Sequence, residues 1–369
     1  LYYGHLEVRD ASGERLDSWI EGFAEAGVRG IRLVFDDADA VYPVTVDPLL
    51  QSAAWEVEGD QSGDQFGWSV ASAGDVNCDG YDDVIVGVPG YGITNDGRAY
   101  VYHGTQSGLE TTPAWTSQDG DYNDHLGSSV GSAGNVNGDI DTDTGLDCDD
   151  VFIAKAEYGS HNAVYVYHGT PSGLSPYCIE PECEIHSPAW GDVGEGMLDE
   201  FGSSVSSAGD VNCDGYDDLI VGAPGYPTVG ATAESRGKVY VYLGGPAGLE
   251  YPESWTAEGE ENGAEFGRSV AAAGNVNGDI DTDSGLECDD VLIGAPGHGG
   301  SDNGRAYVYL GSDSGLESTA SWSEDGDQAG ARFGWSVGAA GNVDGGVLDD
   351  IIIGAPYYDN GETDEGRVY

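Results

Sequence analysis

The stretch that decides the fold runs Phe66-Gly-Trp-Ser-Val-Ala-Ser-Ala-Gly-Asp-Val-Asn-Cys-Asp-Gly-Tyr-Asp-Asp-Val-Ile-Val86. It joins an aromatic–glycine start, a run of small residues, an acidic loop and an apolar segment. The pattern recurs four times at spacings of 60, 75, 65 and 67 residues, with starts at Leu126, Phe201, Phe266 and Phe333. Self-similarity at such a period is typical of repeat architectures, in which each unit packs against its neighbours.

Each repeat contains four short strand-like segments and no helical period. An alternating aromatic strand such as Tyr100-Val-Tyr follows the apolar segment, and a strand around a tryptophan precedes every repeat start: Trp55, Trp115, Trp190, Trp255 and Trp322. Four-stranded units of this length predict an all-β protein, a β-propeller of packed blades, with an open β-sandwich or solenoid as the alternative. The strand at Trp55 could complete the sheet that ends at Tyr369. The number of blades in the full ring stays open.

The domain organisation predicted from these patterns has two parts. Residues 1–50 show strand alternation without the repeat, so we interpret them as the tail of an upstream β domain, and residues 51–369 as the propeller. The chain starts at Leu1 without a charged region followed by an apolar one, and it ends within the strand-like Gly366-Arg-Val-Tyr369. We therefore expect a piece of a longer, signal-bearing precursor, truncated at its C-terminus.

Composition excludes several functional classes. The chain has 12 Lys and Arg against 67 Asp and Glu, a formal net charge of −55, which disfavours nucleic acid and anionic membrane surfaces as partners. A run of about 18 apolar residues, as needed to span a bilayer, does not occur in the sequence. The 61 glycines follow no three-residue period, which excludes collagen, and the 39% hydrophobic share is enough for a packed core.

The acidic loops predict calcium sites. In the first loop (residues 75–83), side-chain oxygens fall at positions 1, 3, 5 and 9, glycine permits a sharp turn at position 6, and position 7 can add a carbonyl oxygen. Hard oxygen ligands in this number suit Ca²⁺. The third loop (residues 210–218) repeats the pattern. The candidate ligands of these two loops are Asp75, Asn77, Asp79, Tyr81, Asp83, Asp210, Asn212, Asp214, Tyr216 and Asp218.

The second loop (residues 135–150) and the fourth loop (residues 275–290) are longer by seven residues and gain two carboxylates each. We expect them to bind metal too, although the acids that complete the shell stay open among Asn135, Asn137, Asp139, Asp141, Asp143, Asp150, Asn275, Asn277, Asp279, Asp281, Asp283 and Asp290. The fifth loop (residues 342–350) is weaker, because Gly346 stands where the third ligand should be. It keeps Asn342, Asp344 and Asp350, and we expect an empty or low-affinity site.

Asn, Asp and Gly are also good turn residues, so a single loop of this kind would not distinguish a turn from a metal site. Five such loops in register, each before an apolar run, favour about four or five Ca²⁺ ions. Carboxylates held within a few ångströms repel each other unless a cation lies between them. A redox-inert ion in a full protein cage leaves no open position for a substrate, so the predicted metal role is structural.

Six cysteines in an acidic, repetitive chain suggest an oxidising compartment. The repeats alternate short and long loops, as in a duplicated two-blade unit, and the pairing that matches this alternation is Cys78–Cys148 and Cys213–Cys288. Cys148–Cys213 is a rival pairing. Cys178 and Cys183 would form a small local loop. His103 and His168 lie at equivalent strand ends, which favours a structural role over a catalytic one.

The Phe-Gly starts and the Gly-Ala-Pro after the apolar segment resemble the FG-GAP repeats of integrin alpha-subunit propellers and their bacterial relatives. The second half stands as Gly87-Val-Pro, Gly222-Ala-Pro, Gly294-Ala-Pro and Gly354-Ala-Pro, and has decayed to Ala154-Lys-Ala in the second repeat. The resemblance covers about residues 53–369. It implies a Ca²⁺-loaded propeller used for extracellular binding or adhesion, in which the loop oxygens named above, with the Tyr81 carbonyl, are the ligands. Integrins have seven blades, whereas five repeats occur here.

The motifs of serine hydrolases, zinc proteases and P-loop enzymes are missing from the sequence. We therefore expect a non-catalytic binding or cell-adhesion module, secreted or displayed at the cell surface, which contacts an extracellular protein or glycan ligand. The alternative is the propeller portion of a secreted polysaccharide lyase or hydrolase whose catalytic domain lies outside this chain. A passive spacer on a cell surface is a third possibility.

Overall fold

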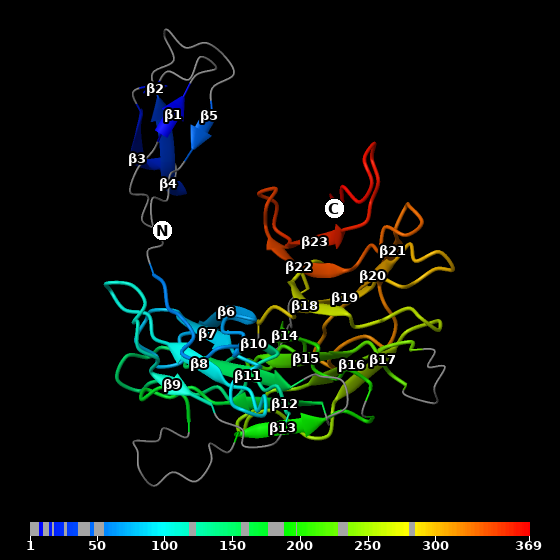
Figure 1. Ribbon diagram of the computed structural model, residues 1–369, viewed down its shortest axis with the longest axis horizontal. Helices are drawn as coiled ribbons and strands as arrows, with labels where there is room; N and C mark the ends of the chain where they lie inside the picture. The colour runs from blue at the N-terminus through cyan, green and yellow to red at the C-terminus, as the bar shows by residue number, and fades with distance from the viewer. Residues whose placement is uncertain are drawn as a thin grey trace. The chain divides into compact units, whose positions relative to one another are not determined.

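The computed structural model describes residues 7–9, 15–16, 18–25, 28–35, 45–47, 55–117, 123–155, 162–175, 188–196, 198–227, 235–279 and 285–369. These residues belong to two compact units, residues 1–57 and residues 58–369. The regular structure of the described residues consists of β-strands without a helix (Figure 1), so the predicted all-β class is confirmed.

The first unit contains two small antiparallel sheets. One sheet has the order β2-β1-β5, formed by Arg15–Leu16, Glu7–Arg9 and Thr45–Asp47. The other pairs β3 (Ser18–Glu25) with β4 (Val28–Phe35) along their whole lengths. The described residues of the first unit therefore form strands where the sequence alternates, and these strands do not build a four-stranded sheet like those of the second unit. Its assignment to an upstream β domain stays a prediction.

The second unit contains five antiparallel sheets in chain order, which we call blades 1 to 5 (Figure 1). Blade 1 consists of β6 (Ser69–Gly74), β7 (Asp83–Gly87), β8 (Ala99–Tyr102) and β9 (Trp115–Thr116). Blade 2 consists of β10 (Ser129–Gly134), β11 (Asp150–Lys155), β12 (Ala163–Tyr167) and β13 (Trp190–Val193). Blade 3 consists of β14 (Ser204–Gly209), β15 (Asp218–Ala223), β16 (Lys238–Tyr242) and β17 (Trp255–Glu258).

Blade 4 consists of β18 (Ser269–Gly274), β19 (Asp290–Ala295), β20 (Arg305–Tyr309) and β21 (Trp322–Asp325). Blade 5 has three strands, β22 (Ser336–Gly341), β23 (Asp350–Ala355) and β24 (Arg367–Val368). The first strands of successive blades pack against each other, from β6 through β10, β14 and β18 to β22. This succession of sheets is the arrangement of a β-propeller built from the repeats.

The structure differs from the sequence-based expectation at Trp55, which lies outside any strand and does not complete blade 5. In blade 1, the equivalent tryptophan strand pairs within its own blade, with Trp115 opposite Val101. Trp55 instead falls within the first compact unit, which ends at Val57. The tryptophan strand therefore belongs to the blade that precedes it in the chain, and blade 5 is described with three strands.

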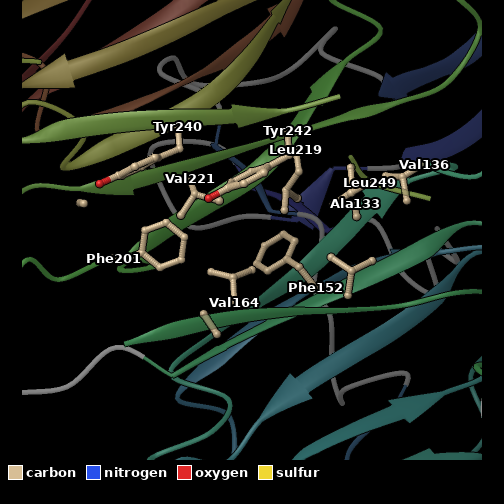
Figure 2. Close-up of a cluster of buried hydrophobic side chains, with 13 residues drawn as sticks. Ala133, Val136, Phe152, Val164, Phe201, Leu219, Val221, Tyr240, Tyr242 and Leu249 are labelled. Carbon is tan, nitrogen blue, oxygen red and sulfur yellow. The ribbon is translucent and has the colours of Figure 1, made fainter. Parts of the chain in front are cut away.

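The hydrophobic core lies between neighbouring blades. Between blades 2 and 3, Phe152 and Val164 of one sheet meet Phe201, Leu219 and Val221 of the next, and all five are at most 3% exposed (Figure 2). Strands β11, β15 and β19 are buried along their whole lengths, because each is covered by sheets on both faces. Such double coverage explains why their apolar segments are continuous rather than alternating.

The aromatic strands add a second repeated contact between blades. Trp190 of blade 2 packs edge-on against Tyr242 of blade 3, with ring centroids 4.6 Å apart. The equivalent pairs Trp115–Tyr167 and Trp255–Tyr309 have centroid distances of 5.0 and 4.9 Å. Edge-to-face pairs of this kind stabilise a core by about 0.5–1.5 kcal/mol beyond their burial. The tryptophan of one blade thus packs against a tyrosine in the third strand of the next blade.

Candidate metal sites in the blade loops

The two short loops have the same internal geometry. In the first loop, the Asp75 carboxylate accepts hydrogen bonds from the backbone N–H groups of Asp79 (3.0 Å) and Gly80 (2.7 Å). In the third loop, Asp210 accepts the corresponding bonds from Asp214 (3.0 Å) and Gly215 (2.7 Å). Gly80 and Gly215 have φ angles of 87° and 90°, a left-handed conformation that glycine adopts at little cost. Glycine therefore closes each loop around its first aspartate.

The aspartate at the end of each loop anchors the loop to its own blade. Both oxygens of Asp83 accept backbone bonds, from Val76 N (3.0 Å) and Gly104 N (2.7 Å). Asp218 does the same with Val211 N and Gly244 N, both at 2.8 Å. Val76 follows β6 and Gly104 follows β8, the two strands that flank β7, so this carboxylate joins the start of the loop to the chain after the third strand.

These anchoring carboxylates are fully buried, and burial penalises their charged form. Burial raises the pKa of Asp83 to about 7 and that of Asp290 to about 6. It raises the pKa of Asp150 and of Asp218 to about 8. The backbone bonds that each group accepts oppose this rise, and the neighbouring loop carboxylates add to it. The surroundings of these four carboxyl groups thus disfavour their charged form.

Buried oxygens without a hydrogen-bond partner mark the first four loops. Within the described residues, these atoms are Oδ1 of Asn77, Asn135, Asp139, Asn212 and Asp279. In the short loops, the amide nitrogen of the same asparagine donates to position 5, as Asn77 does to Asp79 at 3.0 Å. Buried acceptors are normally satisfied, and one left over calls for a ligand such as an ion or water. The donor set of amide and carboxylate oxygens fits a hard cation.

The long loops keep the bond from position 3 to position 5, as between Asn137 Nδ2 and Asp139 Oδ2 at 2.9 Å, and differ at their first residue. Asn135 donates from Nδ2 to the Asp139 carbonyl oxygen at 3.0 Å, and Asn275 donates to the Asp279 carbonyl oxygen at 2.7 Å. Asp141 instead accepts bonds within a turn of its own, from Thr144 Oγ1 (2.7 Å) and Asp143 N (3.0 Å). Asp143 is exposed, and the candidate ligands Asp281 and Asp283 lie outside the described residues.

The fifth loop lacks the features of the other four. Asp350 is only half-buried, although its Oδ2 still accepts the Val343 N–H at 2.8 Å. Asp344 uses its Oδ1 to accept the N–H of Gly346 at 2.7 Å, and Asn342 is exposed. The described part of this loop has no unpartnered buried side-chain oxygen. The geometry therefore agrees with the weak ligand pattern read from its sequence.

The first aspartate of the Asp-Asp doublet in repeats 2 to 5 has a role that the sequence reasoning missed. Asp149 of blade 2 reaches back to blade 1, where its Oδ2 accepts the Asp75 N–H at 2.8 Å. The Asp149 N–H in turn donates to the Asp75 carbonyl oxygen at 3.0 Å. Asp217, Asp289 and Asp349 repeat this contact with the preceding blade. The sequence did carry a signal for this second role, because both aspartates of the doublet recur in every repeat.

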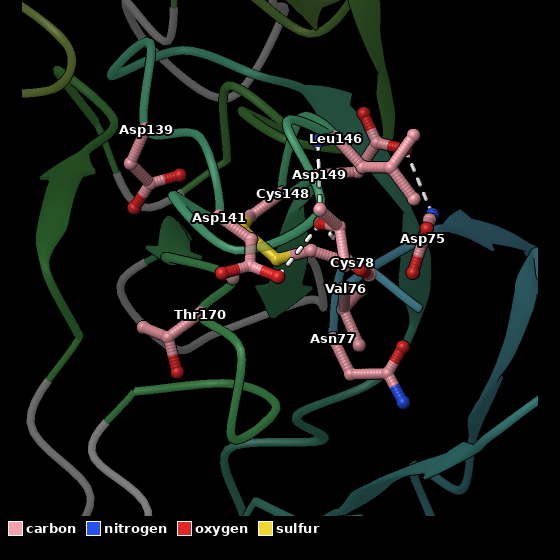
Figure 3. Close-up of a disulfide and its surroundings, with 12 residues drawn as sticks. Asp75, Val76, Asn77, Cys78, Asp139, Asp141, Leu146, Cys148, Asp149 and Thr170 are labelled. Atoms are coloured by element: carbon pink, nitrogen blue, oxygen red, sulfur yellow. Dashed lines mark hydrogen bonds between the residues drawn. A yellow bond between two sulfur atoms is a disulfide. The ribbon is translucent and has the colours of Figure 1, made fainter. Parts of the chain in front are cut away.

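Two disulfides join blades in pairs, as the sequence predicted. Cys78–Cys148 connects the first loop to the second loop, and Cys213–Cys288 connects the third loop to the fourth loop. Figure 3 shows the first bridge next to the contact between Asp75 and Asp149. The rival pairing Cys148–Cys213 is thereby wrong, whereas Cys178 and Cys183 lie outside the described residues.

The decayed Gly-Ala-Pro of the second repeat has a structural explanation. Lys155 stands at its middle position, and its Nζ lies 2.7 Å from Oδ2 of Asp124, with both side chains 9% exposed. Such a pair keeps a buried charge compensated. The corresponding positions of blade 4 are the apolar Ala295 and Ala264, both buried. The second repeat thus has a buried ion pair at positions where the fourth repeat buries two alanines.

His103 and His168 lie beside the first and second loops. His103 Nδ1 is 3.3 Å from Nδ2 of Asn77, and burial lowers the pKa of both imidazoles. Within the described residues, no three side chains of His, Cys, Asp or Glu form a metal-holding group. The described residues also contain no helix long and apolar enough to cross a membrane.

Comparison with known proteins places these observations in a family context. Residues 66–102 and 201–242 match the FG-GAP repeat. The chain is 34% identical over 168 residues to integrin alpha-5 of Xenopus laevis, and 36% identical over 167 residues to integrin alpha-IIb of Homo sapiens. It is 33% identical over 170 residues to integrin alpha pat-2 of Caenorhabditis briggsae.

These alignments cover 42–44% of this chain but only 13–15% of the length of the three relatives. The matched FG-GAP segments correspond to the first three strands of blades 1 and 3, including the first and third loops. Two segments of the chain therefore match the FG-GAP repeat, and part of the chain is similar to integrin alpha subunits, as its sequence motifs predicted.

Proposed function

We propose that this FG-GAP, integrin alpha-like chain is a calcium-stabilised extracellular module that binds a protein or glycan ligand without catalysing a reaction. The observation that carries the metal part is the set of unpartnered buried oxygens in the first four loops. The adhesion part rests on the similarity to integrin alpha subunits and on the repeat architecture. Fold similarity alone is a weak guide to function, so each part has its own test.

Four loops would hold the cations through the oxygens at positions 1, 3 and 5. In the first loop these positions are Asp75, Asn77 and Asp79, and the buried Asp83 anchors the loop from behind. A bound Ca²⁺ supplies positive charge among carboxylates that otherwise repel each other, and it satisfies the asparagine oxygen that has no donor. The chain's own contribution is to hold these oxygens on tight glycine turns at blade ends.

Calcium titration of EDTA-stripped protein by isothermal calorimetry tests the metal part. We expect four ions per chain. Asn212→Ala removes an unpartnered oxygen from the third loop and should lower the count by one. Asp344→Ala changes the corresponding position of the fifth loop and is the matched control, with an unchanged count expected. Absence of binding at millimolar Ca²⁺, or equal counts for the two variants, would contradict the proposal.

The binding role is tested separately on arrays of glycans and extracellular-matrix proteins, probed in Ca²⁺ and in EDTA. A binding module should give a calcium-dependent signal on a restricted set of spots. Uniform silence would favour a spacer role instead. This outcome would leave the calcium count untouched, so the two parts of the proposal can fail independently.

A further inference from the structure

The fourth residue of each acidic loop has a left-handed backbone conformation. In the second, fourth and fifth loops this residue is a glycine, with φ angles of 67° at Gly138, 75° at Gly278 and 77° at Gly345. The two short loops keep the conformation without a glycine, because Cys78 and Cys213 both have a φ of 58°. Such a φ is costly for a residue that carries a Cβ atom. A further contact must therefore hold the fourth residue of the short loops in place.

A disulfide supplies this contact, since the fourth residue of each short loop is half of a bridge. Cys78 is joined to Cys148, and Cys213 is joined to Cys288. The described residues with a positive φ do not include Cys148 or Cys288, so the unfavourable conformation lies on the short-loop side of each bridge. Residues in such conformations persist where the surrounding structure fixes them.

The partner cysteine of each bridge is attached to a firmly held part of the next blade. Cys148 directly precedes Asp149, whose Oδ2 accepts the Asp75 N–H of the first loop at 2.8 Å. The following residue, Asp150, is fully buried at the start of β11. Cys288 has the same place before the doublet of the fourth repeat. Each bridge thus connects a short loop to the buried second strand of the following blade.

The residue that the bridge holds lies between candidate ligands. Cys78 follows Asn77 and precedes Asp79 in the first loop (Figure 3). The Asn77 amide donates to the Asp79 carboxylate at 3.0 Å, and the Asp79 N–H donates to the Asp75 carboxylate at 3.0 Å. A change of φ at Cys78 rotates the chain before it relative to the chain after it. The fourth residue therefore sets whether the oxygens at positions 1, 3 and 5 face one ion.

The two bridges are closed to solvent. Cys78 and Cys148 are each 1% exposed, and Cys213 and Cys288 are 4% and 3% exposed. Thiol–disulfide exchange requires access of an attacking thiolate to a sulfur atom. Burial thus makes each bridge a constant part of its loop rather than a redox switch.

We propose that Cys78–Cys148 and Cys213–Cys288 position the calcium ligands of the first and third loops. Each bridge holds the fourth residue in the left-handed conformation, so that the oxygens at positions 1, 3 and 5 are oriented before an ion binds. This role rests on the calcium binding proposed above. Glycine supplies the same conformation in the second and fourth loops, so a glycine at the fourth position should replace the bridge.

Hydrogen exchange measured by mass spectrometry at a series of free Ca²⁺ concentrations tests this role, with peptides that cover residues 75–83 and 210–218. Cys78→Ala combined with Cys148→Ala removes the first bridge. It should raise the Ca²⁺ concentration for half-maximal protection of the first loop about 5- to 30-fold. Cys78→Gly combined with Cys148→Ala removes the same bridge and should bind Ca²⁺ nearly as wild type does. The third loop keeps its own bridge and should be unchanged in both variants.

The same exchange measurement in EDTA separates loop conformation from ion binding. The N–H groups of Asp79 and Gly80 donate to the Asp75 carboxylate. They should exchange slowly in wild type and in the glycine variant, and faster in the alanine variant. A wild-type chain without any calcium-dependent protection would refute the calcium role itself. The EDTA comparison would then still show whether the bridge fixes the loop.

Asn95→Ala is the matched control for backbone strain, because Asn95 is exposed, has a φ of 53° and lies outside the acidic loops. It should leave the calcium dependence of both short loops unchanged. Cys213→Ala and Cys213→Gly, each combined with Cys288→Ala, should repeat the result at the third loop only. Equal calcium dependence of the alanine and glycine variants would indicate a cross-link without a positioning role and overturn the proposal. An alanine variant that binds Ca²⁺ like wild type also overturns it.

Discussion

Blades 3 and 5 are built from nearly the same repeat, yet their second strands have different surroundings. Strand β15 of blade 3 is buried along its whole length, whereas Asp350, Ile351 and Ile352 at the start of β23 remain accessible. The difference lies in the neighbours, because blade 3 packs against blades 2 and 4, whereas the main contacts of blade 5 in the described part of the chain are with blade 4. A repeat therefore acquires a complete core only between two others.

Calcium removal should have the largest effect on stability. It should also show the clearest difference between blades 3 and 5. A ligand present at about 100 times its Kd stabilises the folded state by about 2.7 kcal/mol per site, so four sites contribute on the order of 10 kcal/mol. Thermal unfolding in EDTA and in millimolar Ca²⁺ measures the total. Hydrogen exchange should show a large loss of protection in β15 and a small one in β23. Equal losses in the two strands would contradict the assignment of a weak fifth site.

Truncation of one isoleucine in each blade sharpens the comparison. Ile220 is fully buried and Ile352 is 44% exposed at the equivalent position. Ile220→Ala should lower the free energy of unfolding by about 2–5 kcal/mol, because it leaves a cavity between blades 3 and 4. Ile352→Ala should cost under about 1 kcal/mol if blade 5 remains uncovered. Urea denaturation of both variants at low protein concentration gives the two values.

A pair of glycine variants tests the contact between the crossing aspartate and the preceding blade. Gly209→Ala introduces a side chain at a φ of 72° and displaces the crossing Asp289, whereas Gly341→Ala meets only the cost of a φ of 61°. The conformational cost is about 1–2 kcal/mol in both cases. Loss of the Asp289 contact adds about 1–3 kcal/mol for Gly209→Ala alone. Similar midpoints of thermal unfolding for the two variants would argue against a stabilising role of the bond between Asp289 and Asp210.

The smallest expected change in the free energy of unfolding follows from removal of a crossing carboxylate. Asp217→Ala removes the acceptor of the Asn135 N–H and should cost about 1–3 kcal/mol. Asp82→Ala, at the same place in blade 1, removes a solvated carboxylate and should leave monomer stability within about 0.5 kcal/mol of wild type. Chemical denaturation at low protein concentration measures the free energy of unfolding of both variants.

Much of this architecture could be predicted from the sequence. The recurrence of Phe-Gly starts and apolar segments indicated five sheets, and the alternation of short and long loops indicated Cys78–Cys148 and Cys213–Cys288. The loop ligands remain predictions, although the unpartnered oxygens of Asn77 and Asn212 lie at predicted positions. Local pattern was sufficient here because strands, turns and loop ligands depend on residues close together in the chain.

Other features could not be predicted, because they depend on contacts between distant residues. Lys155 interrupts its repeat motif, and only its partner Asp124, 31 residues away, explains why a charge is tolerated there. Asp141 stays a candidate ligand, and the sequence did not reveal that it accepts bonds from Asp143 N and Thr144 Oγ1 within its own turn. Trp55 matched the tryptophan strands of the other repeats and yet falls within the first compact unit.

The sequence by itself determined the repeat, the strand order within a blade and the acidic loops, since each follows from residue type and spacing over short distances. Only the tertiary structure decided how each Asp-Asp doublet is used. Adjacent residues of a strand point to opposite sides, so Asp150 turns to its own loop while Asp149 crosses to the preceding blade. The same contact recurs at the four described junctions between successive blades, because at each one the preceding blade supplies the backbone N–H that the crossing aspartate accepts.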